Sequence, residues 1–193
     1  MKTDIILAGV GGQGILSIAA AIGLAAVKNN LYIKQSEVHG MSQRGGDVQS
    51  HLRISDKPIA SDLIPMGKAD LILSIEPMEA LRYLPFLSNS GWLVTNITPF
   101  NNIPDYPNVE DIFKRIEALP NHITIDADVI AKEAGSSRSS NIVMLGAASP
   151  FIDIPFEKLE DGIRELFGKK GESIVNTNLK ALQAGREYSQ KNR

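Results

Sequence analysis

Two polar, glycine-rich segments near the start of the chain carry the residue types and spacings that could do chemistry. The first, residues 9–14 with the sequence GVGGQG, fits the pattern G-x-G-x-x-G between an expected strand and an expected helix. Glycines permit a tight turn and a close approach of the backbone, and the unpaired amides at a helix start attract anions. The alternative is that these glycines only let the helix pack closely on the sheet. The residues expected to face a ligand or a partner are Gly11, Gly12, Gln13 and Gly14.

The second segment, residues 36–46 with the sequence SEVHGMSQRGG, places acid, imidazole, hydroxyl, amide and guanidinium groups together. The guanidinium of Arg44, between polar and glycine neighbours, suits a carboxylate or a phosphate, and His39 could transfer protons near neutral pH. The alternative is a solvated loop whose polar groups bind one another. The expected ligand- or partner-facing residues here are Glu37, His39, Gly40, Ser42, Gln43, Arg44, Gly45 and Gly46.

The same residues raise three other chemistries: a dinucleotide site, a serine nucleophile and a metal site. Glu37 lies roughly 20 residues beyond the glycines, where nicotinamide-binding proteins carry an acid for the ribose, so a dinucleotide site is an open alternative. Residues 40–44 lack the second glycine of G-x-S-x-G, which argues against Ser42 as a nucleophile. The spacing of His39, Asp47 and His51 is not diagnostic of a metal site, and we expect no bound metal and a solvated His51. No catalytic residue is assigned.

Composition excludes several classes of function. The 193 residues carry 20 Lys and Arg against 22 Asp and Glu, a net charge of −2, so no basic field favours nucleic acid or an anionic membrane. The absence of cysteine excludes disulfides, thiolate nucleophiles and cysteine-bound iron–sulfur clusters on this chain. The longest apolar run, residues 15–27, would rise only about 20 Å as a helix, too short for a bilayer. With no convincing signal-peptide core, we expect a cytoplasmic protein.

The elements that must position these residues form an α/β pattern. We expect one domain over residues 1–193, Rossmann-like, with a mostly parallel sheet flanked by helices and a helical C-terminal part. The period-2 alternation in 48–54 indicates a strand that is antiparallel or at an edge. The expected strands are 4–8, 31–35, 48–54, 70–75, 91–96 and 122–126. The expected helices are 13–28, 77–87, 109–119, 141–148, one through 156–167 and one carrying Val175, Leu179 and Leu182.

Taken together, these segments resemble a known family. The pair 9–15 (GVGGQGI) and 36–46 resembles the gamma subunit, or gamma domain, of 2-oxoacid:ferredoxin oxidoreductases, and most of all the small subunits of its indolepyruvate branch. The likeness extends to 74–80 (SIEPMEA), 141–147 (NIVMLGA) and 178–185 (NLKALQAG), so it covers almost the whole chain. Either of the first two segments alone would be weak, but both at this spacing are specific.

The resemblance implies a role in a heteromeric enzyme. Such complexes oxidatively decarboxylate an aryl 2-oxoacid such as indolepyruvate, with coenzyme A (CoA) as co-substrate, to an aryl-acetyl-CoA and CO₂, and reduce ferredoxin. The large partner carries thiamine diphosphate and iron–sulfur clusters, which agrees with the absence of cysteine here. This chain is then expected to bind no cofactor alone and to help position an anionic substrate or CoA. Open alternatives are a gamma subunit for pyruvate, 2-oxoglutarate or branched-chain 2-oxoacids, a free-standing dinucleotide oxidoreductase, and a binding module without a part in turnover.

Overall fold

A six-stranded mixed sheet forms the centre of the protein. The computed structural model describes residues 1–40, 45–101 and 103–193, and the strand order is β2-β3-β1-β4-β5-β6. β3 pairs antiparallel with both β1 and β2, while the ladders β1–β4, β4–β5 and β5–β6 are parallel. The strands are β1 (Lys2–Val10), β2 (Tyr32–His39), β3 (Asp47–Ser55), β4 (Ala69–Ser74), β5 (Leu87–Asn96) and β6 (His122–Ile125).

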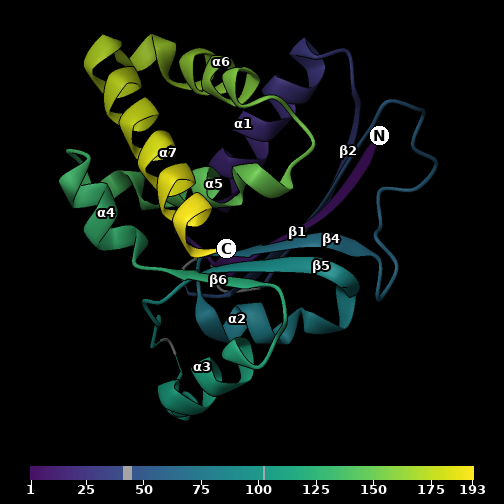
Figure 1. The fold of residues 1–193 in the computed structure, drawn as a ribbon, viewed down its shortest axis with the longest axis vertical. Helices are drawn as coiled ribbons and strands as arrows, with labels where there is room; N and C mark the ends of the chain where they lie inside the picture. The colour runs from purple at the N-terminus through teal and green to yellow at the C-terminus, as the bar shows by residue number, and fades with distance from the viewer. Residues whose placement is uncertain (41–44, 102) are drawn as a thin grey trace.

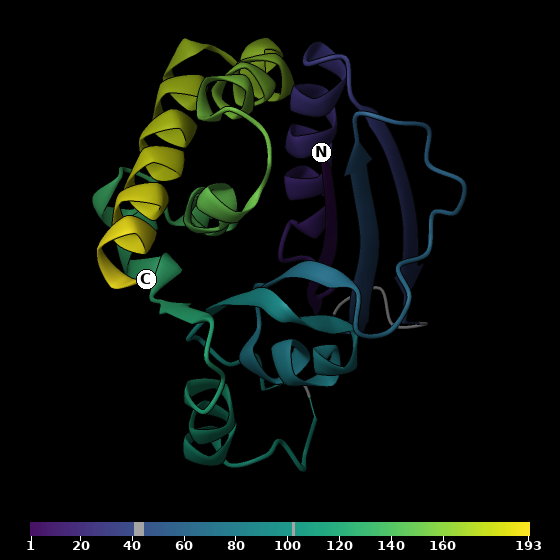
Figure 2. The same ribbon diagram turned by 45° about the vertical axis from the view of Figure 1, so that its right-hand side comes forward.

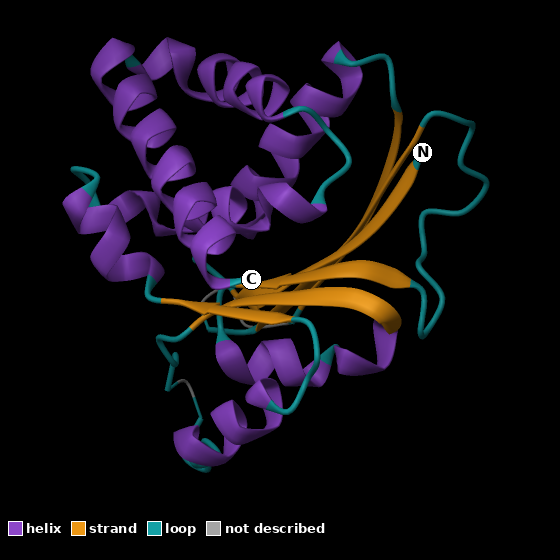
Figure 3. Ribbon diagram, viewed as in Figure 1, coloured by secondary structure: helices purple, strands orange, loops and turns teal. Residues whose placement is uncertain are grey.

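Helices cover both faces of this sheet (Figure 1). α2 and α3 lie against one face, and α1, α5, α6 and α7 form a larger layer on the other, as the turned view also shows (Figure 2). Figure 3 separates the helical and strand layers by colour. The helices are α1 (Ile15–Lys28), α2 (Pro77–Arg82), α3 (Val109–Glu117), α4 (Ala127–Glu133), α5 (Ser140–Ala148), α6 (Phe156–Phe167) and α7 (Glu172–Asn192). Short 3₁₀ helices are η1 (Leu84–Phe86), η2 (Ser137–Ser139), η3 (Ser149–Phe151) and η4 (Gly168–Lys170).

The alternation of side chains along β1 feeds two separate cores. Ile5 and Leu7 belong to the core under the larger helical layer, whereas Ile6 and Ala8 belong to the core under α2 and α3. Because successive strand residues point to opposite faces, the continuous apolar run of β1 is the pattern expected for a strand covered on both sides. The sheet is therefore buried on both faces at its centre.

Glycines set the close packing in the larger helical layer. A Cβ on Gly146 of α5 would lie 2.0 Å from the backbone oxygen of Leu182 in α7, and one on Gly185 of α7 would lie 1.9 Å from the oxygen of Val143. Only a residue without a side chain allows these two backbones to approach so closely. α5 and α7 are thereby fixed against each other behind the N-terminal end of α1.

Most of the expected elements are confirmed, with differences at the second strand. β2 runs to His39, so Ser36–His39 are strand and the expected loop over 36–46 begins only at residue 40. These residues read as loop because β2 has one neighbour and stays half exposed, which permits polar side chains. β3 is antiparallel as expected but lies between β2 and β1, not at the edge.

Two further differences lie in the second half of the chain. The helix expected over 77–87 ends at Arg82, because Pro85 interrupts the helical hydrogen bonds and the chain passes through η1 into β5. Helix α4 was not expected from the sequence. Within the described residues, no helix combines the length and the apolar character that a membrane span requires.

Candidate functional site

The two polar segments meet at one edge of the sheet. β1 and β2 are both antiparallel to β3, so their C-terminal ends lie at the same edge, which is also where β4 ends. The turn from β1 into α1 starts there. In open α/β sheets, ligands bind outside the carboxyl ends of the strands, which makes this edge the natural place for a site.

Residues 9–14 form a turn that is fixed by its own side chain. The amide of Val10 donates to Oε1 of Gln13 at 2.9 Å, and the amide of Gln13 donates to the oxygen of Val10 at 3.2 Å. Gly12 and Gly14 have φ of 96° and 83°, which glycine adopts without strain. Gln13 therefore holds the turn in shape, and Gly14 caps α1 without a side-chain hydrogen bond.

Backbone hydrogen bonds join this turn to the second segment. The amide of Gly11 donates to the oxygen of Gly46 at 2.8 Å, and that of Gly45 donates to the oxygen of Gly11 at 3.5 Å. The amide of Gly40 donates to the oxygen of Asp47 at 2.7 Å. The two segments singled out in the sequence are thus in direct contact. The candidates Ser42, Gln43 and Arg44 lie outside the described residues.

Glu37 and His39 lie on β2, one strand further from the turn than a dinucleotide site would place them. Glu37 is level with Ser50 of β3, which in turn is level with Leu7 of β1, so β3 separates the acid from the glycine strand. In dinucleotide-binding folds the acid ends the strand next to the glycine strand. The carboxylate of Glu37 is engaged by Nε2 of His39 and by Gln35. This arrangement does not favour the dinucleotide alternative.

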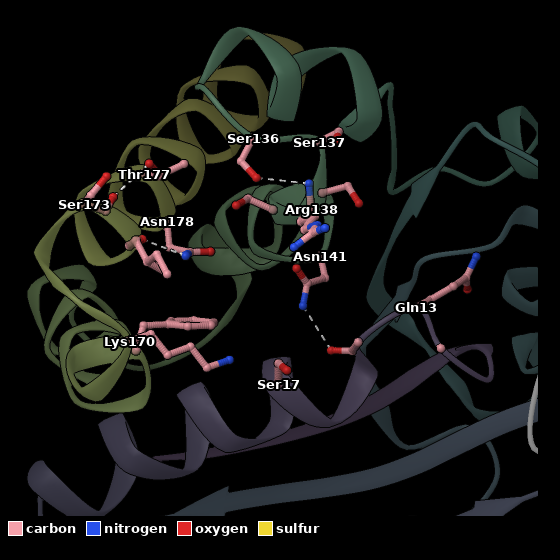
Figure 4. Close-up of a pocket in the computed structure, with 16 residues that line it drawn as sticks. Gln13, Ser17, Ser136, Ser137, Arg138, Asn141, Lys170, Ser173, Thr177 and Asn178 are labelled. Atoms are coloured by element: carbon pink, nitrogen blue, oxygen red, sulfur yellow. Dashed lines mark hydrogen bonds between the residues drawn. The ribbon is translucent and has the colours of Figure 1, made fainter.

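A cleft of about 670 Å³ opens beside the turn, on the face covered by the larger helical layer (Figure 4). The N-terminal ends of α1, α5 and α7 all border it, and so do Arg138 and Lys170. Among the described residues that line it there is no Asp or Glu. The lining residues are Gly12, Gln13, Gly14, Ser17, Ser136, Ser137, Arg138, Ser139, Ser140, Asn141, Phe167, Lys170, Ser173, Ile174, Thr177 and Asn178.

The chemistry of this cleft suits an anion with several phosphate oxygens. Helix N-termini present amides and a positive partial charge, hydroxyl groups donate further hydrogen bonds, and the two cations balance charge. Asn141 joins two of the walls, because its Nδ2 donates to the oxygen of Gly14 at 3.2 Å across the cleft (Figure 4). Three of the expected residues, Gly12, Gln13 and Gly14, line the cleft.

Sequence reasoning missed most of the remaining lining residues. Arg138 sits in a serine-rich segment, residues 136–140, and Lys170 precedes the glycine that starts α7. These signals are local helix-start patterns, which by themselves indicate capping and not binding. Only the packing of α5 and α6 against α1, and of α7 against α5 and α6, brings them to the glycine turn.

On the opposite face, two buried acids lie in the first turn of α2 and at its N-cap. Glu76 is fully buried, and its carboxylate caps α2 by accepting the amide of Glu79 at 2.8 Å. It also accepts the amide of Phe100 at 3.2 Å and the hydroxyl of Tyr106. Burial, together with the nearby Glu76 carboxylate, raises the pKa of Tyr106. Glu76 therefore stabilises the start of α2 and the segment after β5.

A second acidic cluster joins α2 to the first residue of β3. The Tyr83 hydroxyl lies 2.8 and 2.7 Å from the two carboxylate oxygens of Asp47, and Nε of Arg82 lies 2.7 Å from Oε2 of Glu79. Burial raises the pKa of Glu79 to about 7; Arg82 lowers it and Asp47 raises it further. Burial and the bond to Asp47 also raise the pKa of Tyr83.

The expectation of a solvated His51 is wrong. The side chain is buried, because the segment after β3 folds back over it: Nδ1 accepts the amide of Ile64 at 2.9 Å, and the ring meets Phe86 edge-on. Burial lowers the pKa of His51. Among the described residues, no group of three His, Cys, Asp or Glu side chains is arranged to hold a metal ion.

Comparison with known proteins places the chain in context. Residues 4–188 match the family described as pyruvate ferredoxin/flavodoxin oxidoreductase. The indolepyruvate oxidoreductase subunit IorB of Archaeoglobus fulgidus is 38% identical over 194 residues, covering 96% of this chain and 94% of that protein.

Solved structures share the fold. The keto/oxoacid ferredoxin oxidoreductase gamma subunit of Geobacter sulfurreducens superposes with a TM-score of 0.72 at 24% identity, covering 98% of this chain and 99% of that one. The 2-oxoglutarate:ferredoxin oxidoreductase of Magnetococcus marinus, solved with 2-oxoglutarate, coenzyme A and succinyl-CoA bound, superposes with a TM-score of 0.77 at 23% identity. The match covers 98% of this chain and 31% of that one. At these identities the structures establish the fold alone.

Proposed function

Because the chain belongs to the pyruvate ferredoxin/flavodoxin oxidoreductase family, we propose that it is the small subunit of an indolepyruvate (aryl 2-oxoacid):ferredoxin oxidoreductase. In this proposal residues 1–193 act as one gamma-type domain of a cytoplasmic complex. The complex converts an aryl 2-oxoacid and CoA to aryl-acetyl-CoA and CO₂ and reduces ferredoxin. The small subunit binds CoA, and the large subunit carries the redox chemistry.

The cleft beside the glycine turn carries this proposal. CoA is a polyanion with a pyrophosphate and a 3′-phosphate, and the cleft offers helix N-termini, hydroxyl groups, Arg138 and Lys170 without a lining acid among its described residues. The identity of 38% over nearly the whole of an indolepyruvate subunit, against 28% to the 2-oxoglutarate synthase subunit KorC of Methanothermobacter thermautotrophicus, supports the aryl substrate. In this proposal the glycine turn is where the backbone comes closest to the phosphates of CoA.

The redox groups are assigned to the large subunit. An iron–sulfur cluster needs thiolate ligands, and this chain has no cysteine, so its residues do not fit such a cluster. We assign thiamine diphosphate to the large subunit as well. The part left to this chain is to hold the phosphates of CoA so that the thiol is presented to the partner in a fixed orientation.

The test removes the two cations of the cleft in the assembled complex. Arg138→Ala with Lys170→Ala is expected to raise the KM for CoA roughly thirtyfold, at about 1 kcal/mol for each exposed cation. The kcat at saturating CoA and the KM for indolepyruvate should stay unchanged, because in this proposal the two side chains bind the phosphates of CoA and not the 2-oxoacid. The matched control is Lys132→Ala with Lys169→Ala, two exposed cations outside the cleft.

Three outcomes would overturn the proposal. An unchanged KM for CoA in the double variant would remove CoA from the cleft. A higher kcat/KM with pyruvate, 2-oxoglutarate or a branched-chain 2-oxoacid than with indolepyruvate would reassign the substrate. Full turnover by the small subunit alone, or heat on titration with NAD, NADP or FAD, would favour a free-standing oxidoreductase.

A further inference from the structure

Asp47 occupies the point where β1 and β2 end and β3 begins. Its backbone pairs with Val10, the last residue of β1, and its oxygen accepts the amide of Gly40 just after β2. The preceding residue, Gly46, accepts the amide of Gly11 at 2.8 Å. Any displacement of Asp47 is therefore passed directly to the glycine turn.

The side chain of Asp47 is held from the α2 face of the sheet, opposite the cleft. Tyr83, 6% exposed, donates its hydroxyl to the Asp47 carboxylate, and Glu79, 1% exposed, is near enough for Asp47 to raise its pKa. α2 itself packs against β1 and β4. The cluster is thus built between a helix and a strand end, with little access to water at Glu79.

Two carboxyl groups in this setting cannot both ionise without strong repulsion. Coulomb repulsion between neighbouring charges grows as water is excluded, so the buried Glu79 beside Asp47 retains its proton to a higher pH than a free glutamate. The charged and titratable groups around Glu79 are Asp47 on β3, Glu76 just before α2, Arg82 at its end, Tyr83 just after it, and Tyr106 ahead of α3. Arg82 is half exposed, so its charge is partly screened.

We propose that Asp47, Glu79 and Tyr83 form a positioning unit for the glycine turn, which keeps the turn in its CoA-binding shape while Glu79 is protonated. The unit acts through the backbone of Asp47, Gly46 and Gly11 and touches neither substrate. This inference rests on the proposed function, because it assigns the turn to CoA. Loss of the Glu79 proton drives the two carboxyl groups apart and moves the strand end that the turn depends on.

The first experiment follows the KM for CoA of the assembled complex between pH 6 and pH 8. In the wild type the KM should rise by about fivefold over this range, the effect of roughly 1 kcal/mol of coupling, while kcat changes little. Glu79→Gln keeps the shape without the titration, so this rise should disappear. Glu117→Gln, an exposed acid on α3, is the control and should follow the wild type.

The second experiment measures the stability of the glycine turn in the absence of any ligand. Amide hydrogen exchange of Gly11 and Gly40, corrected for the intrinsic pH dependence, should show protection that falls from pH 6 to pH 8 in the full-length wild type and stays level in Glu79→Gln. Tyr83→Phe removes the hydroxyl that holds Asp47 and should lower the protection at both pH values. It also serves where Glu79→Gln folds poorly.

The results separate this inference from the proposed function. Identical pH dependence of KM and of protection in the wild type and Glu79→Gln would overturn the positioning unit, even if CoA binds. The expected exchange behaviour combined with a complex that shows no dependence on CoA would instead overturn the proposed function. A fall in kcat without a change in KM would mean that the cluster acts elsewhere than at the turn.

Discussion

At the C-terminal ends of β1 and β4, the two faces of the sheet differ in their charged residues: one face carries exposed cations and the other carries buried acids. On the cleft side, Arg138 and Lys170 are exposed cations. On the α2 side, Glu76 and Glu79 are acids with 0% and 1% exposure, surrounded by donors from the protein itself. Both regions border the glycine turn, but only the first offers unshielded charge to a ligand.

The difference follows from the cost of burying charge. A buried carboxylate is tolerated only when the protein supplies its hydrogen bonds, as the amides of Glu79 and Phe100 do for Glu76. An exposed cation remains hydrated and can exchange water for a phosphate. The cleft side is therefore suited to binding, and the α2 side is suited to holding the binding side in place.

The largest expected effect on stability comes from the close packing of α5 and α7, which forms the walls of the cleft. Gly146→Ala would place a methyl group 2.0 Å from the oxygen of Leu182, so α5 and α7 must separate. We expect a loss of about 3 kcal/mol or more in the free energy of unfolding, measured with urea. Gly168→Ala is the control, because its Cβ would meet nothing within 4 Å.

A stability loss in Gly146→Ala of the same size as in Gly168→Ala would contradict the close approach of α5 and α7. In that case the walls of the cleft would not depend on these glycines. The comparison between the two faces would then lose its structural basis on the cleft side.

The next effect tests the buried acid on the α2 side through pH. The pKa of Glu79 in the folded chain is raised to about 7 from an ordinary 4.5, so the folded state binds more protons between these values. The free energy of unfolding should therefore fall as pH rises from about 4.5 to about 7, by up to about 3 kcal/mol relative to Glu79→Gln.

The measurement is urea unfolding of the wild type and Glu79→Gln at matched pH values. His51, whose lowered pKa acts in the opposite direction below about pH 6.5, contributes equally to both proteins and cancels in the difference. A difference in the free energy of unfolding that stays constant across the pH range would mean that the pKa of Glu79 is not raised. The contrast between the two faces would then not include a buried acid that holds its proton.

The sequence predicted the α/β fold, but of the residues that line the cleft it singled out only the glycine turn, Gly12, Gln13 and Gly14. The glycine turn was found because its spacing and its place between strand and helix are local properties. Arg138 and Lys170 were missed because they line the same cleft as Gly14 only through the packing of α5 and α6 on α1 and of α7 on α5 and α6. The end of β2 was missed because an edge strand with one partner accepts polar residues that also suit a loop.

A smaller effect is expected where an acid caps a helix. Glu76→Gln keeps one acceptor oxygen but loses the charge that binds the amides of Glu79 and Phe100, so we expect about 2 kcal/mol of destabilisation in urea. Glu133→Gln, an exposed acid at the end of α4, should change stability by less than about 0.5 kcal/mol. Equal losses of stability in the two variants would show that the hydrogen bonds to the Glu76 carboxylate do not stabilise the fold.

The smallest effect links the two faces through the glycine turn. Asn141 reaches the turn from the cleft side by donating to Gly14, while Tyr83 reaches it from the α2 side through Asp47. Asn141→Ala should cost about 1 kcal/mol of stability, whereas Asn121→Ala, which removes a longer 3.4 Å bond to Ser90, should cost less.

The double variant Asn141→Ala with Tyr83→Phe then decides whether the faces are coupled. If the turn transmits strain between them, the loss in stability should differ from the sum of the single losses by at least about 0.5 kcal/mol. Additive losses would mean that the turn is rigid enough to be held from either face alone. In that case the buried acids would stabilise α2 and β3 without positioning the cleft, and the two faces would be independent structures that share only an edge.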